Sequence, residues 1–159
     1  MVGDVATHDF GELKFDFIYS WSVFEHIPPD DLPGIVTRIK TMLTPKGIAL
    51  ITPDVFTGIT GGHLVEWYGH VVDKDIPRLS EPWEHLRKAR YKANTYMNRL
   101  ARSSYRELFR QHFEILEERA LHPDMGRRWL TPALRAELAE WDEDELFSNT
   151  VQFVLRPRV

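Results

Sequence analysis

Residues 15–51 read FDFIYSWSVFEHIPPDDLPGIVTRIKTMLTPKGIALI and decide the fold class of the chain. The aromatic and β-branched run at 15–20 is typical of a buried strand, and 48–51 form a second such run. Between them, apolar residues at helical spacing from Leu32 to Leu43 predict a helix, with Asp30 as its cap and Pro33 in its first turn. Residues 44–47 predict a turn. This order predicts two parallel strands joined by a right-handed crossover.

Further elements are predicted along the rest of the chain. Residues 56–98 are irregular, although Pro82 suits the first turn of a helix that runs through the basic residues after it. Ser104 and Glu107 have the spacing of a capping box. Strands are expected at 113–121 and 147–155, with a helix beginning at Thr131-Pro132 between them. Together these elements predict a single α/β domain over 1–159, with helices on the faces of a sheet.

Composition limits the class of protein. Of 159 residues, 43% are apolar and 28% charged, which is typical of a packed globular domain rather than a disordered chain. The absence of cysteine excludes disulfides, thiolate zinc and a cysteine nucleophile, and it favours a cytoplasmic protein. No apolar run approaches the roughly 20 residues of a membrane span, and the first residues do not resemble a signal peptide.

Charge is unevenly distributed along the chain. The segment from Arg87 to Arg110 is basic and that from Glu137 to Glu145 is acidic, while the net charge is −4. Two solvated helix faces of opposite sign are the ordinary interpretation. Because the basic segment contains no recognised nucleic-acid motif, we expect no nucleic-acid binding; an anionic acceptor remains an alternative.

Three segments in this order carry a family resemblance: Gly3-Asp4, residues 15–27 and residues 43–51. They resemble the middle motifs of class I S-adenosylmethionine (SAM)-dependent methyltransferases, although Lys46 stands where that family often has glycine. The resemblance implies an incomplete Rossmann-like sheet, made of the family's strands 4, 5, 7 and 6 with the last strand antiparallel. It also implies a helical insertion on the acceptor side, at about residues 57–98.

The same resemblance implies that part of the cofactor site is missing. The family's first strand, its G-x-G loop and the acid that binds the ribose would all precede residue 1. Gly61-Gly62 is no replacement, because it does not follow a strand and open a helix. We therefore expect a truncated C-terminal half that binds SAM weakly or not at all and is inactive alone.

Several residues are implied to contact the cofactor. Asp4 matches the acid that accepts a hydrogen bond from the adenine amino group, and Val5 would lie beside the ring. Ser20, Trp21 and Ser22 lie at the carboxyl end of the first strand, where open α/β sheets bind ligands. The alternatives are that Asp4 caps a loop and that Trp21 packs under a helix.

His26 is the candidate general base, since a neutral imidazole can take a proton near pH 7. The alternative is a structural histidine that supports its loop, as in many members of the family. We expect its neighbour Glu25 to be solvated or to cap the loop.

Acceptor binding is assigned to His63, Trp67 and Tyr68, which offer a stacking surface after the second strand. The alternative is a loop held by aromatic packing. His63 and His70 share a helical face, but no third ligand is evident, so no metal is predicted.

These assignments predict methyl transfer from SAM to a small-molecule acceptor, an in-line displacement that depends mainly on positioning. One alternative is a non-catalytic methyltransferase-like module for self-assembly or partner binding, and another is an unrelated α/β interaction domain. Because strand 15–20 would lack its family partner, it forms an apolar edge, and we expect a homodimer through it.

Overall fold

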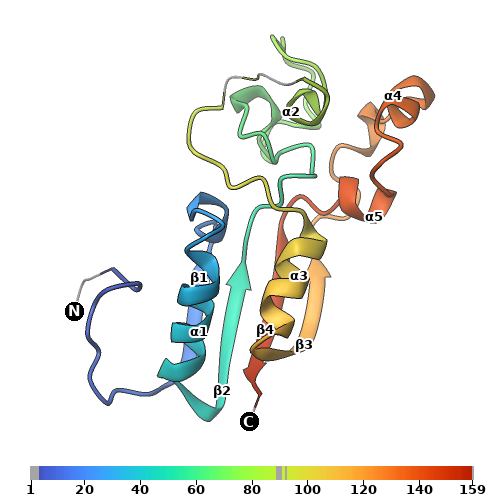
Figure 1. Ribbon diagram of the computed structural model, residues 1–159. Helices are drawn as coiled ribbons and strands as arrows, with labels where there is room; N and C mark the ends of the chain where they lie inside the picture. The colour runs from blue at the N-terminus through green and yellow to red at the C-terminus, as the bar shows by residue number, and fades with distance from the viewer. Residues whose placement is uncertain (1–3, 89–90, 92, 159) are drawn as a thin grey trace.

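The computed structural model describes residues 4–88, 91 and 93–158, and these form an α/β fold around one four-stranded sheet (Figure 1). The strands are β1 (Phe15–Trp21), β2 (Leu43–Thr52), β3 (Phe113–Ala120) and β4 (Val151–Pro157). The helices are α1 (Leu32–Met42), α2 (Glu84–Arg87), α3 (Arg102–Arg110), α4 (Pro132–Glu137) and α5 (Glu143–Leu146), with 3-10 turns η1 (Phe24–His26), η2 (Val65–Trp67) and η3 (Arg127–Trp129).

The sheet has the strand order β1-β2-β4-β3. β1 and β2 run parallel, with Ile18 opposite Ala49 and Trp21 opposite Thr52. β4 is antiparallel to both of its neighbours, so it alone runs against the other strands. The predicted crossover between two parallel strands and the antiparallel final strand are therefore confirmed, and β1 forms one edge of the sheet.

Residues 44–47, predicted as a turn, lie inside β2, where they interrupt the regular pairing of β2 with β1. The register moves from Phe15 opposite Leu43 to Phe17 opposite Ile48, which leaves these four positions outside the regular pairing. Pro45 has no N–H to donate, so it is tolerated at such a bulge. A Cβ on Gly47 would lie 2.9 Å from the carbonyl oxygen of Phe15, which explains why glycine occupies this close approach.

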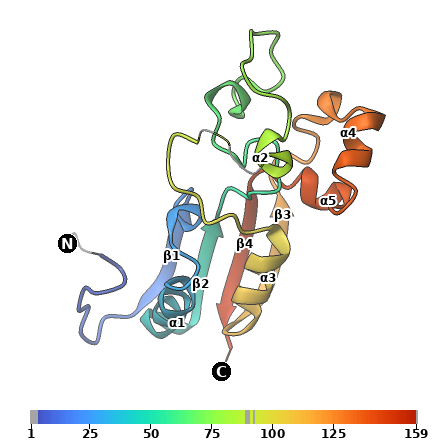
Figure 2. The same ribbon diagram turned by 45° about the horizontal axis from the view of Figure 1, so that its top comes forward.

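α1 and α3 lie on the same face of the sheet, as both views show (Figures 1 and 2). Their buried side chains form the main core together with the inward residues of β2 and β4, among them Val36, Ile39, Tyr105, Phe109, Ile51 and Phe153. The expected helix cap is shifted by one residue: Asp31 precedes α1, and its side chain makes no capping hydrogen bond.

The insertion lies beyond the carboxyl ends of β1 and β2 (Figure 1). It packs on the segment that contains α4 and α5, and the two share a second core that includes Trp67, Trp83, Leu138 and Phe147. The helix predicted to run from Pro82 through the basic segment ends after one turn, because α2 stops at Arg87. The basic positions 90 and 92 lie outside the described residues. Within the described part, no helix has the length and apolar character to cross a membrane.

Candidate functional site

The carboxyl ends of β1 and β2 bring together the loops that carry the candidate residues. Immediately after β1, the Ser22 N–H donates to the carbonyl of Thr52 at 2.9 Å. Ser22 adopts a left-handed backbone, with φ of 49°, which turns the chain sharply out of the strand. Glu25 and His26 follow in η1, and Asp54 follows β2. Because the strands are parallel, both loops lie at the edge of the sheet where α/β folds bind ligands.

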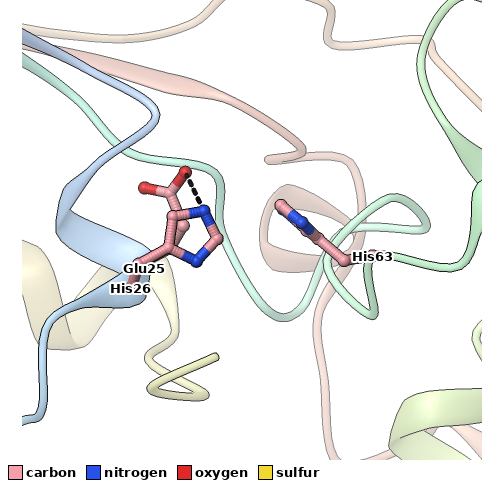
Figure 3. Close-up of side chains that lie close together, drawn as sticks. All are labelled: Glu25, His26 and His63. Atoms are coloured by element: carbon pink, nitrogen blue, oxygen red, sulfur yellow. Dashed lines mark ion pairs between the residues drawn. The ribbon is translucent and has the colours of Figure 1, made fainter. Parts of the chain in front are cut away.

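His26 is held by its loop through one ring nitrogen. Its Nδ1 lies 2.8 Å from the carbonyl oxygen of Tyr96, and a carbonyl only accepts, so Nδ1 carries the proton. In the neutral ring, the lone pair is then on Nε2, which lies 3.7 Å from Oε1 of Glu25 (Figure 3). The geometry of His26 is thus compatible with both roles considered from the sequence. Its Nδ1 makes a structural hydrogen bond, and its Nε2 carries the lone pair that a general base needs.

Glu25 is buried, which corrects the expectation of a solvated or capping residue. Only 1% of it is exposed, and neither carboxylate oxygen has a hydrogen-bond partner among the described residues. Burial, and to a smaller extent repulsion from Asp54, raises the pKa of Glu25 from 4.5 to about 7. The backbone amides of Glu25 and Asp54 offset part of this rise without a well-formed hydrogen bond. The charged form of Glu25 is thus poorly stabilised in this site.

His63 reaches the same place from the insertion. Its ring meets that of His26 edge to face, with centroids 5.2 Å apart. Its Nε2 lies 3.8 Å from Oδ2 of Asp54, whose Oδ1 accepts the Thr150 hydroxyl at 2.7 Å. Burial tends to raise the pKa of Asp54, but hydrogen bonding to His63 and Thr150 outweighs it and lowers that pKa overall. Asp54 therefore stays anionic beside the His63 ring.

A cleft of about 650 Å³ opens beside this cluster. His63, Tyr68 and His70 line it, together with Asp54, Met125 and Thr150. Trp67 is placed differently from the other residues assigned to the acceptor. It is 1% exposed, packs edge to face on Trp129, and donates its indole N–H to Ser80 at 2.9 Å. Of the three predicted acceptor residues, His63 and Tyr68 line the cleft, and Trp67 belongs to the core beneath it.

The predicted cofactor residues fall into two groups. Asp4 lines a second cleft, of about 720 Å³, together with His26 and Ile27. Its Oδ1 accepts the backbone N–H of Ala6 at 2.8 Å, which is the loop-capping geometry given as its alternative role. Val5 packs against the main core.

The other group lies at the end of β1. Ser20, half-buried, and Trp21, 45% exposed, are the last two residues of that strand, and Ser22 follows them. None of these three is among the residues that line the cleft beside Asp4. The structure thus brings Asp4 and His26 together but does not bring Ser20–Ser22 into the same cleft.

A family model described as a methyltransferase domain matches residues 3–121, more than half of the chain. The chain belongs to this methyltransferase family. No curated protein matches the methyltransferase domain significantly.

Solved structures share the fold of this methyltransferase domain at low sequence identity. The PH0226 protein from Pyrococcus horikoshii OT3 is 14% identical with a TM-score of 0.51, over 99% of this chain and 58% of that one. PKMT2 from Rickettsia typhi, solved in complex with AdoHcy, is 13% identical with a TM-score of 0.52, over 97% and 38%. A chain of the Haloferax volcanii complex between the Trm112 methyltransferase activator and a methyltransferase is 17% identical with a TM-score of 0.54, over 100% and 61%. The domain thus spans less than two thirds of each of these structures.

Two residues of this site, Glu25 and Asp54, lie outside the set that the sequence analysis predicts. Glu25 precedes the candidate base, but nothing in its neighbours along the chain indicates burial. Asp54 directly follows the Thr52-Pro53 end of a predicted strand, and that position is a usable signal, because polar residues at the carboxyl ends of parallel strands gather at one edge.

Proposed function

We propose that this chain is the C-terminal part of a SAM-dependent methyltransferase that methylates a small-molecule acceptor and is inactive alone. The observation that carries the proposal is the parallel pairing of β1 and β2, which places the Glu25-His26 loop and Asp54 at one edge of a methyltransferase fold. A structural neighbour that holds AdoHcy supports SAM as the cofactor. In this proposal Asp4, Val5 and Ser20–Ser22 contribute to the cofactor side.

The acceptor would occupy the cleft lined by His63 and Tyr68. Methyl transfer moves the carbon from the sulfonium to the acceptor atom, and the electron pair of the broken bond stays on sulfur. A base is needed only for an acceptor that loses a proton. Nε2 of His26 is available for that proton, because Nδ1 is committed to the carbonyl of Tyr96.

Calorimetry with S-adenosylhomocysteine tests the cofactor assignment. We expect weak or no binding by residues 1–159 and clear binding by a longer chain that includes the residues encoded upstream. In the longer chain, Asp4→Asn should weaken binding, while its amide oxygen can still accept the Ala6 N–H. Asp9→Asn is the matched control, since Asp9 caps Gly11 in the same way, at 2.7 Å. Absence of binding in both chains would reject the enzyme proposal.

A second candidate function, a non-catalytic module for self-assembly, is favoured by the surface of β1. The side chains of Phe17, Tyr19 and Trp21, at every second position, share one face of this edge strand and are 57%, 57% and 45% exposed. Such an apolar edge is a template for pairing with another chain. In this proposal two copies join their sheets across β1, with or without methyl transfer.

A further inference from the structure

Glu25, His26 and His63 form a cluster in which a bound ion would occupy the Nε2 lone pair of His26, which the proposed methyl transfer uses only for an acceptor that loses a proton. One ligand atom of each lies within 4.8 Å of the other two. Figure 3 shows the Glu25 carboxylate beside the His26 ring, with the ring of His63 turned toward both.

Glu25 lacks a counter-charge or donor. Its two carboxylate oxygens are buried without a partner in the described part of the chain, although buried carboxylates are ordinarily hydrogen-bonded or paired. Among the described residues no lysine or arginine forms an ion pair with Glu25, and the polar ring beside it is the imidazole of His26, at 3.7 Å. A divalent cation would satisfy these oxygens.

The ring of His26 is already in the tautomer that can bind a metal ion. The hydrogen bond from Nδ1 to the Tyr96 carbonyl fixes the tautomer that leaves the Nε2 lone pair free. Metal-bound histidines ordinarily make this kind of hydrogen bond through the nitrogen that does not bind the ion. Since Nε2 without a proton cannot donate to Glu25 at 3.7 Å, the two ligand atoms face each other across a gap that a cation can bridge.

His63 completes the set from a different part of the chain. Its backbone is left-handed, with φ of 49°, and Asp54 lies beside its ring at 3.8 Å. A carboxylate next to a metal-binding imidazole orients the ring and raises its basicity. Tetrahedral zinc separates its ligand atoms by about 3.4 Å, so the three side chains would need to close by about 1 Å.

We propose that Glu25, His26 and His63 form a binding site for a divalent transition-metal ion, best suited to Zn²⁺. Two imidazoles and one carboxylate suit zinc, whereas Mg²⁺ and Ca²⁺ prefer sites made of oxygen alone. The imidazoles of His26 and His63 are partly exposed, at 34% and 16%, so an ion can enter. Three protein ligands leave a fourth position for water or a ligand.

Zinc titration of the chelator-treated chain, followed by calorimetry and by the visible absorption of substituted Co²⁺, tests this site. We expect one equivalent of ion to bind. Glu25→Gln and His63→Asn should each weaken binding at least tenfold, and asparagine suits the left-handed backbone at position 63. His70→Asn is the matched control, since His70 lines the same cleft outside the cluster, and it should bind as the wild type does.

His26→Asn provides an independent variant if Glu25→Gln fails to fold. Its side-chain amide can still donate to the Tyr96 carbonyl, but the Nε2 lone pair is lost, so binding should again fall at least tenfold. Circular dichroism verifies the fold of each variant. The proposal is overturned if the wild type binds no stoichiometric ion, or if His70→Asn loses as much affinity as His63→Asn. Ion binding is measured without cofactor or acceptor, so this outcome is separate from that of the methyltransferase proposal.

Discussion

The carboxylate of Glu145 accepts the backbone N–H of Arg102 at 3.0 Å, so that a side chain of α5 caps the first turn of α3. The other oxygen accepts the N–H of Ser103 at 2.9 Å. The first N–H groups of a helix have no partner within the helix, and the Ala101 side chain that precedes α3 cannot provide one. Glu145 therefore joins the second core to the helix that covers the sheet.

Replacement of this carboxylate should destabilise the protein. Glu145→Ala leaves two backbone donors without their acceptor, and we expect a loss of about 1–2 kcal/mol in the free energy of unfolding. Urea denaturation followed by circular dichroism measures it. Asp144→Ala is the control, because Asp144 lies in the same turn of α5 and is exposed. Equal losses in the two variants would show that charge at this turn matters, rather than the cap.

This cap also shows where the sequence misleads. Ser104 and Glu107 have the spacing of a capping box, yet Ser104 lies inside α3, which begins two residues earlier at Arg102. A motif of four residues cannot reveal an acceptor that arrives from more than 40 positions away. By contrast, the helix predicted to begin at Thr131-Pro132 does begin there, and Thr131 caps it by accepting the N–H of Leu134, a partner only three positions away.

The same distinction between local and distant partners holds for the site. The pattern of residues 15–51 predicts two parallel strands. The predicted end of the first strand is enough to locate Ser22 and His26 at the ligand-binding edge of the sheet. The burial of Glu25 and its approach to His63 depend on the insertion, whose path has no periodicity to read. The aromatic neighbours of His63 indicate a stacking surface, and only the fold brings its ring against that of His26.

Glu25 should make the stability of the metal-free protein fall as pH rises. Its pKa is raised to about 7 in the fold, from 4.5. Between these values the folded protein keeps a proton that the unfolded chain releases, so the stabilisation is complete below pH 4.5 and lost as pH passes 7.

Glu25→Gln removes this dependence. The variant should match the wild type near pH 4 and exceed it by about 1–3 kcal/mol at pH 8, as measured by urea denaturation with a chelator present. Glu12→Gln, on the exposed N-terminal segment, is the control and should show no such divergence. A constant difference between Glu25→Gln and the wild type at every pH would contradict the raised pKa.

His85 should make the stability of the protein rise with pH, the opposite of the effect of Glu25. It lies on α2 and is buried within the insertion, its Nε2 donates to the carbonyl of Phe56 at 2.8 Å, and burial lowers its pKa from 6.5 to about 4. Between pH 4 and 6.5 the unfolded chain binds a proton that the folded protein does not bind. The free energy of unfolding therefore rises with pH across this window.

Glutamine at position 85 keeps a donor near the position of Nε2 but cannot titrate. We expect the stability of the wild type relative to His85→Gln to increase by about 1–3 kcal/mol between pH 4 and 6.5 and to level off above it. Thermal unfolding at a series of pH values measures this, with His70→Gln on the surface as control. If the two proteins lose stability in parallel on acidification, His85 is not the group that titrates.

The two edges of the sheet allow a direct test of the proposed homodimer. Tyr19 lies on β1 and is 57% exposed, whereas Leu116 lies on β3 at the opposite edge and is 43% exposed. Lysine on an edge strand opposes pairing with a second strand, because its charge would have to be desolvated in the joined sheet. Tyr19→Lys should therefore shift the wild-type dimer to monomer in sedimentation velocity, and Leu116→Lys should leave it a dimer. A wild type that stays monomeric up to the highest concentration, or a dimer lost only in Leu116→Lys, would exclude association through β1.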